Sequence, residues 1–134
     1  CNKAGMMDYI DLIGKPFSPG GRGPDNYDCY GLVKELYRRS GIELPEYAYD
    51  SPDNFSLIHR LINGDKDLFE RLEKPEPYCL VLFTIQPPYI SHIGVVLEDC
   101  HTFIHASEKV RVSVAKLDHP VWERSIRGFL KWKK

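Results

Sequence analysis

The sequence has no excess of either charge and no long apolar run. Its 134 residues include 18 lysines and arginines against 19 aspartates and glutamates. Balanced charge creates no field that attracts nucleic acid or an acidic membrane, so we expect neither as a partner. No stretch approaches the roughly 20 apolar residues of a membrane-spanning helix, and no secretory leader opens the chain. We therefore expect no transmembrane segment, and a targeting signal that was either removed or never present.

Cysteine is scarce, and its spacing matches no compact disulfide framework. The four cysteines are scattered along a chain that is long enough to fold without disulfide bonds. A zinc site around Cys100, His101 and His105 stays an alternative, although it lacks a CxxC pair. We expect no metal or other cofactor. Cys1 is either the lipid anchor of a mature lipoprotein or a residue that precedes a native start further along.

The residues that are present favour one α+β domain. With 43% apolar residues the chain can build one core, so we expect residues 1–134 to form a single domain. A short apolar helix or turn at 7–13 comes first, and helical patterns follow at 28–40, 51–64 and 66–74. The apolar period then changes to two, in runs at 79–85, 92–98, 101–107, 110–117 and 126–132. Helices before strands predict N-terminal helices packed on a C-terminal antiparallel sheet of about five or six strands.

The helix predicted from about residue 28 begins with a cysteine in its first turn. Asp28 or Asn26 is the expected N-cap, and Gly41 is the expected C-terminal stop. One apolar stripe at helical spacing contains Cys29, Leu32, Val33 and Leu36. The thiol therefore starts on the side of the helix that faces the core.

Two histidines lie on neighbouring predicted strands, and the turn between the strands decides whether they share a face. A four-residue turn over 98–101 would put His105 opposite Gly94, on the same face as His92. A two-residue turn would put the histidines directly opposite each other, and a three-residue turn would put them on opposite faces. Neighbouring rungs of one face lie about 5–8 Å apart, close enough for one imidazole to orient the other.

A cysteine at a helix start and two histidines on one sheet face are the groups that thiol catalysis requires. A free thiol with a pKa near ~8.5 is mostly protonated at neutral pH, so a helix N-terminus and an imidazole are the usual means of activation. We assign Cys29 as nucleophile, His92 as base and later acid, and His105 as the residue that orients His92. The alternatives are a small core cysteine and ordinary structural histidines.

These residues lie in segments that resemble the NlpC/P60 cysteine peptidases, papain-like enzymes that cut peptides of the bacterial cell wall. Three matching motifs are "DCYGL" at 28–32, "HIG" at 92–94 and "FIHAS" at 103–107, and the likeness covers nearly the whole chain. Within the family, segment 20–45 looks most like the phage tail assembly and tail-tip subgroup. The resemblance implies the papain-like NlpC/P60 fold, and hydrolysis of an amide next to a D-isoglutamyl residue in a peptidoglycan stem peptide (muropeptide).

The resemblance also implies where substrate contacts would lie. Many members carry a tyrosine about twelve residues before the cysteine, whose hydroxyl helps to bind the oxyanion, whereas this chain has Phe17. Losing such a donor costs on the order of a hundredfold in rate. The backbone N–H of Cys29 remains, and Tyr27 or Tyr30 would have to supply the hydroxyl. Arg22 is either a ligand for a substrate carboxylate or a solvated loop residue, and Ser91 is a further candidate for substrate binding.

The implied substrate places the protein outside the cytoplasm, at the cell envelope, or has it delivered to the wall by a phage tail. Phage tail or envelope proteins are then the expected partners. Two other functions stay open. The chain would be a weak or inactive binding component of the same fold, as Phe17 suggests, or a transferase that passes a thioester acyl group to an amine or lipid.

Overall fold

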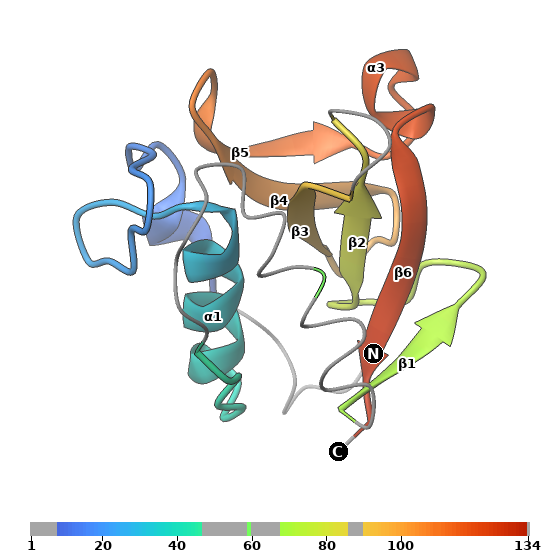
Figure 1. The fold of residues 1–134 in the computed structure, drawn as a ribbon, viewed down its shortest axis with the longest axis horizontal. Helices are drawn as coiled ribbons and strands as arrows, with labels where there is room; N and C mark the ends of the chain where they lie inside the picture. The colour runs from blue at the N-terminus through green and yellow to red at the C-terminus, as the bar shows by residue number, and fades with distance from the viewer. Residues whose placement is uncertain (1–7, 47–58, 60–67, 86–89, 134) are drawn as a thin grey trace.

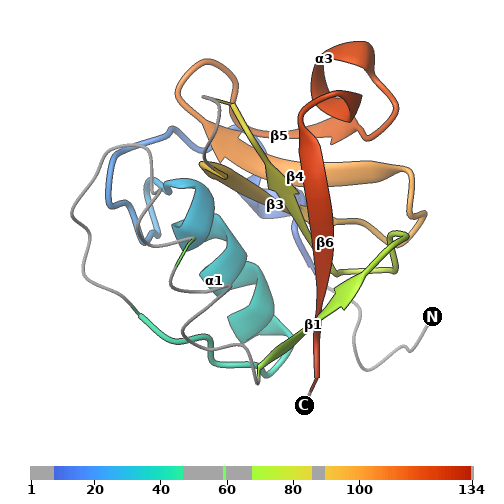
Figure 2. The same ribbon diagram turned by 45° about the vertical axis from the view of Figure 1, so that its right-hand side comes forward.

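The computed structural model describes residues 8–46, 59, 68–85 and 90–133, and it has the expected α+β architecture (Figures 1 and 2). The elements are η2 (Ile10–Leu12), α1 (Cys29–Arg39), β1 (Phe69–Leu72), β2 (Leu80–Phe83), β3 (His92–Val96), β4 (Thr102–Ser107), β5 (Arg111–Lys116), α3 (Pro120–Glu123) and β6 (Ile126–Trp132). All five runs of alternating sequence form strands, as predicted. Within this described part of the chain, no helix has the length and apolarity needed to cross a membrane.

Helix α1 begins and ends where the sequence indicates. The Oδ1 atom of Asp28 accepts a hydrogen bond of 2.6 Å from the backbone N–H of Gly31, so Asp28 is the N-cap. A cap of this kind stabilises a helix by about 1 kcal/mol. Gly41 follows the last turn with φ +86, a conformation that favours glycine. The predicted apolar stripe is buried, and Cys29 is 3% exposed.

The strands form one six-stranded antiparallel sheet in the order β1-β6-β2-β3-β4-β5. Strands β2, β3, β4 and β5 form a meander, in which each strand pairs with the next. Strand β6 pairs with both β1 and β2. Helix α1 packs against β3 and β4. A second apolar cluster lies on the opposite face and includes Trp122 of α3, so α1 and α3 lie on opposite sides of the sheet (Figure 1).

One predicted helix is wrong, and one small helix was not predicted. Part of the 66–74 segment is strand β1, which pairs with β6 so that Phe69 lies opposite Trp132. The two rings meet edge to face at 5.4 Å, and this packing outweighs the local helix propensity of Leu, Glu, Arg and Lys. The unpredicted helix is α3. The predicted helix over 51–64 lies outside the described residues except for His59, which is exposed.

Candidate active site

The two histidines meet on one face of the sheet. The register pairs Val95 with Ile104, which leaves 98–101 as a four-residue turn, the even length that the sequence required. The Nε2 atom of His92 lies 2.8 Å from the Nδ1 atom of His105, within hydrogen-bonding distance. The side chains are only 7% and 1% exposed, so this hydrogen bond is buried. The prediction of a shared face is therefore confirmed.

Gly94 makes the close approach of the two strands possible. It follows His92 by two residues and faces the same side as His105. A Cβ atom at Gly94 would lie 2.9 Å from the carbonyl oxygen of Ile104 and 3.3 Å from the Cβ of His105. The first distance is shorter than real Cβ contacts allow, so any larger residue here would push β4 and its histidine away. The glycine in "HIG" thus has a direct steric reason.

The hydrogen bond between the histidines determines which nitrogen can act as a base. Because Nε2 of His92 faces His105, Nδ1 is the nitrogen that remains to accept a proton from a substrate or a thiol. This requires the tautomer in which Nε2–H of His92 donates to Nδ1 of His105. Burial lowers the pKa of both imidazoles, and the neighbouring His105 lowers that of His92 further. Both rings are thus neutral at neutral pH, and His92 is able to act as a base.

Aromatic side chains surround the histidine pair. Phe83 lies opposite His92 in the β2–β3 register, with ring centroids 5.6 Å apart, and Phe103 contacts His105 at 4.9 Å. Trp122 of α3 contacts both imidazoles. Sequence reasoning missed all three. The i, i+2 spacing of Phe103 and His105 would have placed them on one face, but Trp122 is distant in sequence and gave no such signal.

Cys29 lies at the start of the helix that packs on the strands of the histidine pair. It shares a core cluster with Ile93 of β3 and Ile104 of β4. His92 precedes Ile93 and His105 follows Ile104. Both imidazoles therefore point to the sheet face opposite that of Ile93 and Ile104. His92 is the first residue of β3, and Cys29 is the first residue of α1. Each of the two candidate groups is thus the first residue of its element, and thiol catalysis requires the start of α1 and the start of β3 to meet.

Phe17 lies beside the chain that leads into α1. It forms an isolated parallel bridge with Tyr27, and the N–H of Ser18 donates to the carbonyl of Tyr27 at 3.2 Å. The ring of Tyr27 is buried and packs over Gly23, where a Cβ would lie 2.5 Å from the phenol oxygen. Desolvation raises the pKa of that phenol. The phenol of Tyr27 thus lies beside Gly23, and its role in oxyanion binding stays a prediction.

Tyr30 and Arg22 hold the segments around the helix start. The hydroxyl of Tyr30 donates to the carbonyl of Pro45. The Nη1 atom of Arg22 donates to Oδ1 of Asp28 at 2.8 Å, and its Nε and Nη2 atoms donate to the two carboxylate oxygens of Glu46 at 2.8 and 3.0 Å. Arg22 thus pairs with two of the protein's own acids, and its role toward a substrate carboxylate stays a prediction.

Ser91 fixes the start of β3. Its N–H donates to the carbonyl of Phe83 at 3.0 Å, and its Oγ accepts from the N–H of Ile85 at 3.4 Å. The side chain is 9% exposed. These contacts extend the β2–β3 pairing by one residue, so Ser91 positions His92 directly after it.

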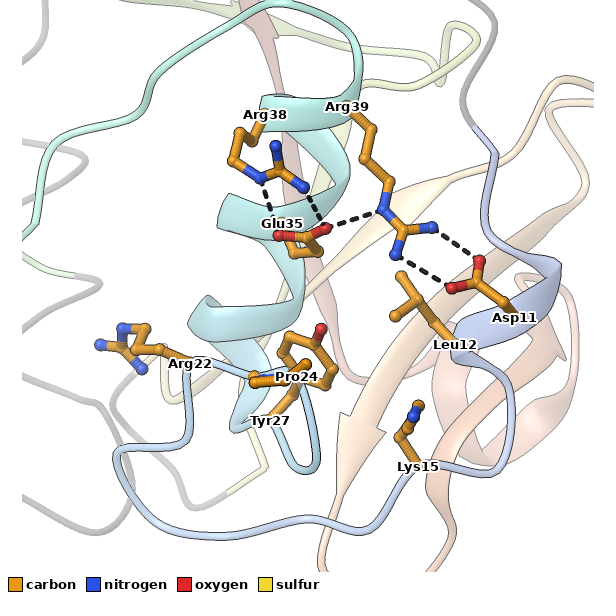
Figure 3. Close-up of a pocket in the computed structure, with 10 residues that line it drawn as sticks. Asp11, Leu12, Lys15, Arg22, Pro24, Tyr27, Glu35, Arg38 and Arg39 are labelled. Atoms are coloured by element: carbon orange, nitrogen blue, oxygen red, sulfur yellow. Dashed lines mark hydrogen bonds and ion pairs between the residues drawn. The ribbon is translucent and has the colours of Figure 1, made fainter.

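A hollow of about 450 Å³ lies beside α1 and the loop before it (Figure 3). Arg39 joins its two acidic residues, with Nη1 2.6 Å from Asp11 and Nε 2.8 Å from Glu35. Arg38 also pairs with Glu35, at 2.7 Å. None of the three candidate catalytic residues lines the hollow. Its ion pairs tie η2 to α1, which is a structural role.

The thiols and histidines of the described residues do not gather around a metal. No group of three or more His, Cys, Asp or Glu side chains in these residues has the arrangement of a metal site. Cys100 and His101 lie in the β3–β4 turn, whereas His105 contacts His92. Among the described residues, Cys29, Cys79 and Cys100 form no disulfide.

Comparison with known proteins identifies the family. A sequence model of the NlpC/P60 family matches residues 14–131, which is most of the chain. The chain therefore belongs to the NlpC/P60 family. Among curated proteins, the "Probable endopeptidase p60" of Listeria innocua serovar 6a is 48% identical over 33 residues, which is 25% of this chain and 7% of that protein.

Solved structures share the fold. An NLP/P60 family protein similar to a lipoprotein, from Staphylococcus aureus subsp. aureus Mu50, matches with a TM-score of 0.65 and 23% identity, over 92% of this chain and 38% of that chain. The peptidoglycan hydrolase RipB from Mycobacterium tuberculosis matches with a TM-score of 0.59 and 17% identity, over 90% and 58%. At these identities the likeness concerns the fold alone, and this chain spans less than two thirds of either protein.

Proposed function

We propose that residues 1–134 act as a single catalytic domain, a cysteine peptidase that hydrolyses a D-isoglutamyl amide bond in peptidoglycan stem peptides. The observation that carries this proposal is the buried His92–His105 hydrogen bond of 2.8 Å, on the two strands against which α1 packs with Cys29 at its start. A base held by a second group and a thiol at a helix N-terminus are the components of thiol nucleophilic catalysis, and the proposal requires that they meet.

The reaction divides into two acyl-transfer steps. Nδ1 of His92 takes the proton of the Cys29 thiol as the sulfur attacks the amide carbonyl, and a tetrahedral oxyanion forms. His92 then gives that proton to the leaving amine, the C–N bond breaks, and a thioester remains on Cys29. Water attacks the thioester with His92 as base, which releases the carboxylate and restores the thiol. His105 holds the ring of His92 in the required tautomer throughout.

The names of related proteins support the same chemistry. One curated relative is called a probable endopeptidase, and RipB is called a peptidoglycan hydrolase. The D-isoglutamyl specificity follows from the resemblance to cell-wall peptidases. This substrate would put the protein at the cell envelope, or at the wall during phage entry with tail proteins as partners. A lipid anchor at Cys1 would fit an envelope location, and Cys1 lies outside the described part of the chain.

Muropeptide digestion tests the proposal. Purified protein is incubated with isolated muropeptides, and the products are identified by mass spectrometry. We expect cleavage next to D-isoglutamate by the unmodified chain and none by Cys29→Ala. The matched control is Cys100→Ser, which removes the thiol of a partly exposed turn and should cleave normally. Equal cleavage by Cys29→Ala and the unmodified chain would refute the thiol mechanism.

A binding component of low activity is the second candidate function, and Phe17 is the observation that favours it. Phe17 has no hydroxyl to stabilise an oxyanion, and Tyr27 and Tyr30 have their rings or hydroxyls engaged in packing and in a contact with Pro45. If muropeptides bind but are not cut, this second function is favoured. Product carrying an added amine instead of water would indicate a transferase.

A further inference from the structure

Trp122 fits into the corner that the two catalytic imidazoles form. The rings of His92 and His105 are nearly perpendicular, at 82°, with centroids 5.0 Å apart. The indole of Trp122 lies at 24° to the ring of His92 with centroids 6.0 Å apart, and at 77° to the ring of His105 at 4.8 Å. One aromatic side chain therefore stacks on the base and meets its partner edge to face.

The indole covers the His92–His105 pair on the side that the residues of the sheet leave uncovered. Phe83 of β2 and Phe103 of β4 contact the imidazoles from the same sheet face, and their centroids lie 5.3 and 5.5 Å from that of Trp122. Trp122 comes instead from α3, between β5 and β6, and it is only partly buried. It thus lies between the histidine pair and solvent. None of these three rings is ionisable, and Ser113 of β5 lies opposite His105 in the register.

Local contacts hold α3 in this position. The Nδ1 atom of His119 accepts a hydrogen bond of 3.2 Å from the N–H of Val121, and Pro120 occupies the first turn. The N–H groups of Trp122 and Glu123 donate to the carbonyl of His119 at 2.9 and 2.8 Å. A capped turn of this kind gives Trp122 a defined backbone.

We propose that Trp122 is a positioning residue for the histidine pair, which fixes the plane of the His92 ring and excludes water from its hydrogen bond to His105. Two physical effects support this role. The indole packs beside both imidazoles, at centroid distances of 6.0 and 4.8 Å, so its removal would leave a cavity in which the rings have more freedom to turn. Exclusion of water strengthens a hydrogen bond between neutral groups, and it also keeps both imidazoles neutral because burial penalises the charged form. The catalytic meaning of the proposal rests on the proposed function, whereas the effect on the pair does not.

Three variants test the proposal. Trp122→Ala removes the cover, Trp122→Phe keeps an aromatic ring, and Val121→Ala changes a half-exposed neighbour on α3 as the matched control. The first measurement is NMR of the imidazole nitrogens against pH. For Trp122→Ala we expect both histidines to titrate closer to the ordinary value of about 6.5 and to lose their fixed tautomer. We expect Trp122→Phe to keep most of the unmodified behaviour and Val121→Ala to keep all of it.

The second measurement is muropeptide turnover as a function of pH. Trp122→Ala should lower kcat by about ten- to a hundredfold with little change in KM, because the base is misplaced while the substrate site is intact. The acid limb of the pH profile should move upward. Trp122→Phe should recover most of kcat.

A purely structural Trp122 would give different results. Trp122→Ala would then lower the thermal unfolding midpoint but leave the imidazole tautomers and titration unchanged, and that outcome would overturn the proposal. If the unmodified protein cuts no muropeptide, the proposed function fails, but the NMR titration still decides whether Trp122 positions the pair. If Trp122→Ala does not fold, Trp122→Phe is measured instead. The proposal then requires a smaller shift of both histidine pKa values toward 6.5.

Discussion

Arg22 forms an ion pair with Asp28, the residue directly before Cys29. The Nη1 to Oδ1 distance is 2.8 Å, and the side chain of Asp28 is completely buried while that of Arg22 is 24% exposed. The same Oδ1 atom caps α1 through the N–H of Gly31. Loop 18–26 and the start of the helix are thereby held by one carboxylate, which makes the position of Cys29 depend on Arg22.

Replacing Arg22 should therefore destabilise the protein. Arg22→Ala leaves a buried carboxylate without its cation, so we expect the free energy of unfolding in urea to fall by roughly 2–4 kcal/mol. The matched control is Arg38→Ala. Arg38 also pairs with a carboxylate, but its side chain is 60% exposed and its ion pair is screened by solvent, so the loss should be much smaller than for Arg22→Ala. Equal losses for the two variants would show that the Arg22–Asp28 pair has no special structural role.

His105 can be tested with two amides of different length. In His105→Asn the amide oxygen takes the place of Nδ1 and can accept the Nε2–H of His92, whereas the longer side chain of His105→Gln cannot put an acceptor at the same point. We expect His105→Asn to retain at least about tenfold more kcat than His105→Gln in the muropeptide assay. If His105→Gln is as active as His105→Asn, the 2.8 Å hydrogen bond does not orient the base.

Phe17 offers a test of the oxyanion site. Phe17→Tyr adds a hydroxyl at the position where many family members carry one, and turnover should be preserved or should rise by up to about a hundredfold. Phe17→Leu, which keeps an apolar side chain and adds no donor, is the control and should show no gain. A large loss of turnover in Phe17→Tyr would mean that the oxyanion lies elsewhere.

Stability should depend on pH through the histidine pair. Burial lowers the pKa of both imidazoles from 6.5, that of His105 to about 4. The unfolded chain then binds protons below about pH 6.5 that the folded chain does not, so stability is complete above that pH and is lost as pH falls toward 4. We expect the free energy of unfolding in urea to fall by a few kcal/mol over this window. His105→Asn removes one titrating group and should show a shallower fall, and an unchanged slope would contradict the assignment.

The histidine pair could be predicted from sequence because it depends on local rules. Strand alternation and the length of one turn decide whether His92 and His105 share a face, and both are visible in a short segment. The start of α1 was equally accessible, since a cap residue and an apolar stripe are local signals. In both cases the residues that decide the structure are close together in the sequence.

Features that depend on contacts distant in sequence could not be predicted. Strand β1 exists because β6 pairs with it, although its own sequence favours a helix. The ion pair of Arg22 with Glu46 joins two loops whose approach no spacing rule describes. Trp122 reaches the histidines from the four-residue helix α3, which follows β5. The sequence around Trp122 has no periodicity that would link it to β3 or β4.

The most direct test of the account is the rate at which Cys29 reacts with iodoacetamide at neutral pH, with and without His92. Peptide mass spectrometry measures the alkylation of Cys29 and, as an internal standard, of the partly exposed Cys100 in the same sample. We expect His92→Asn to slow Cys29 by on the order of tenfold or more while Cys100 reacts as before. If Cys29 reacts equally fast in both proteins, the thiol and the imidazole do not act together, and the proposed mechanism is wrong.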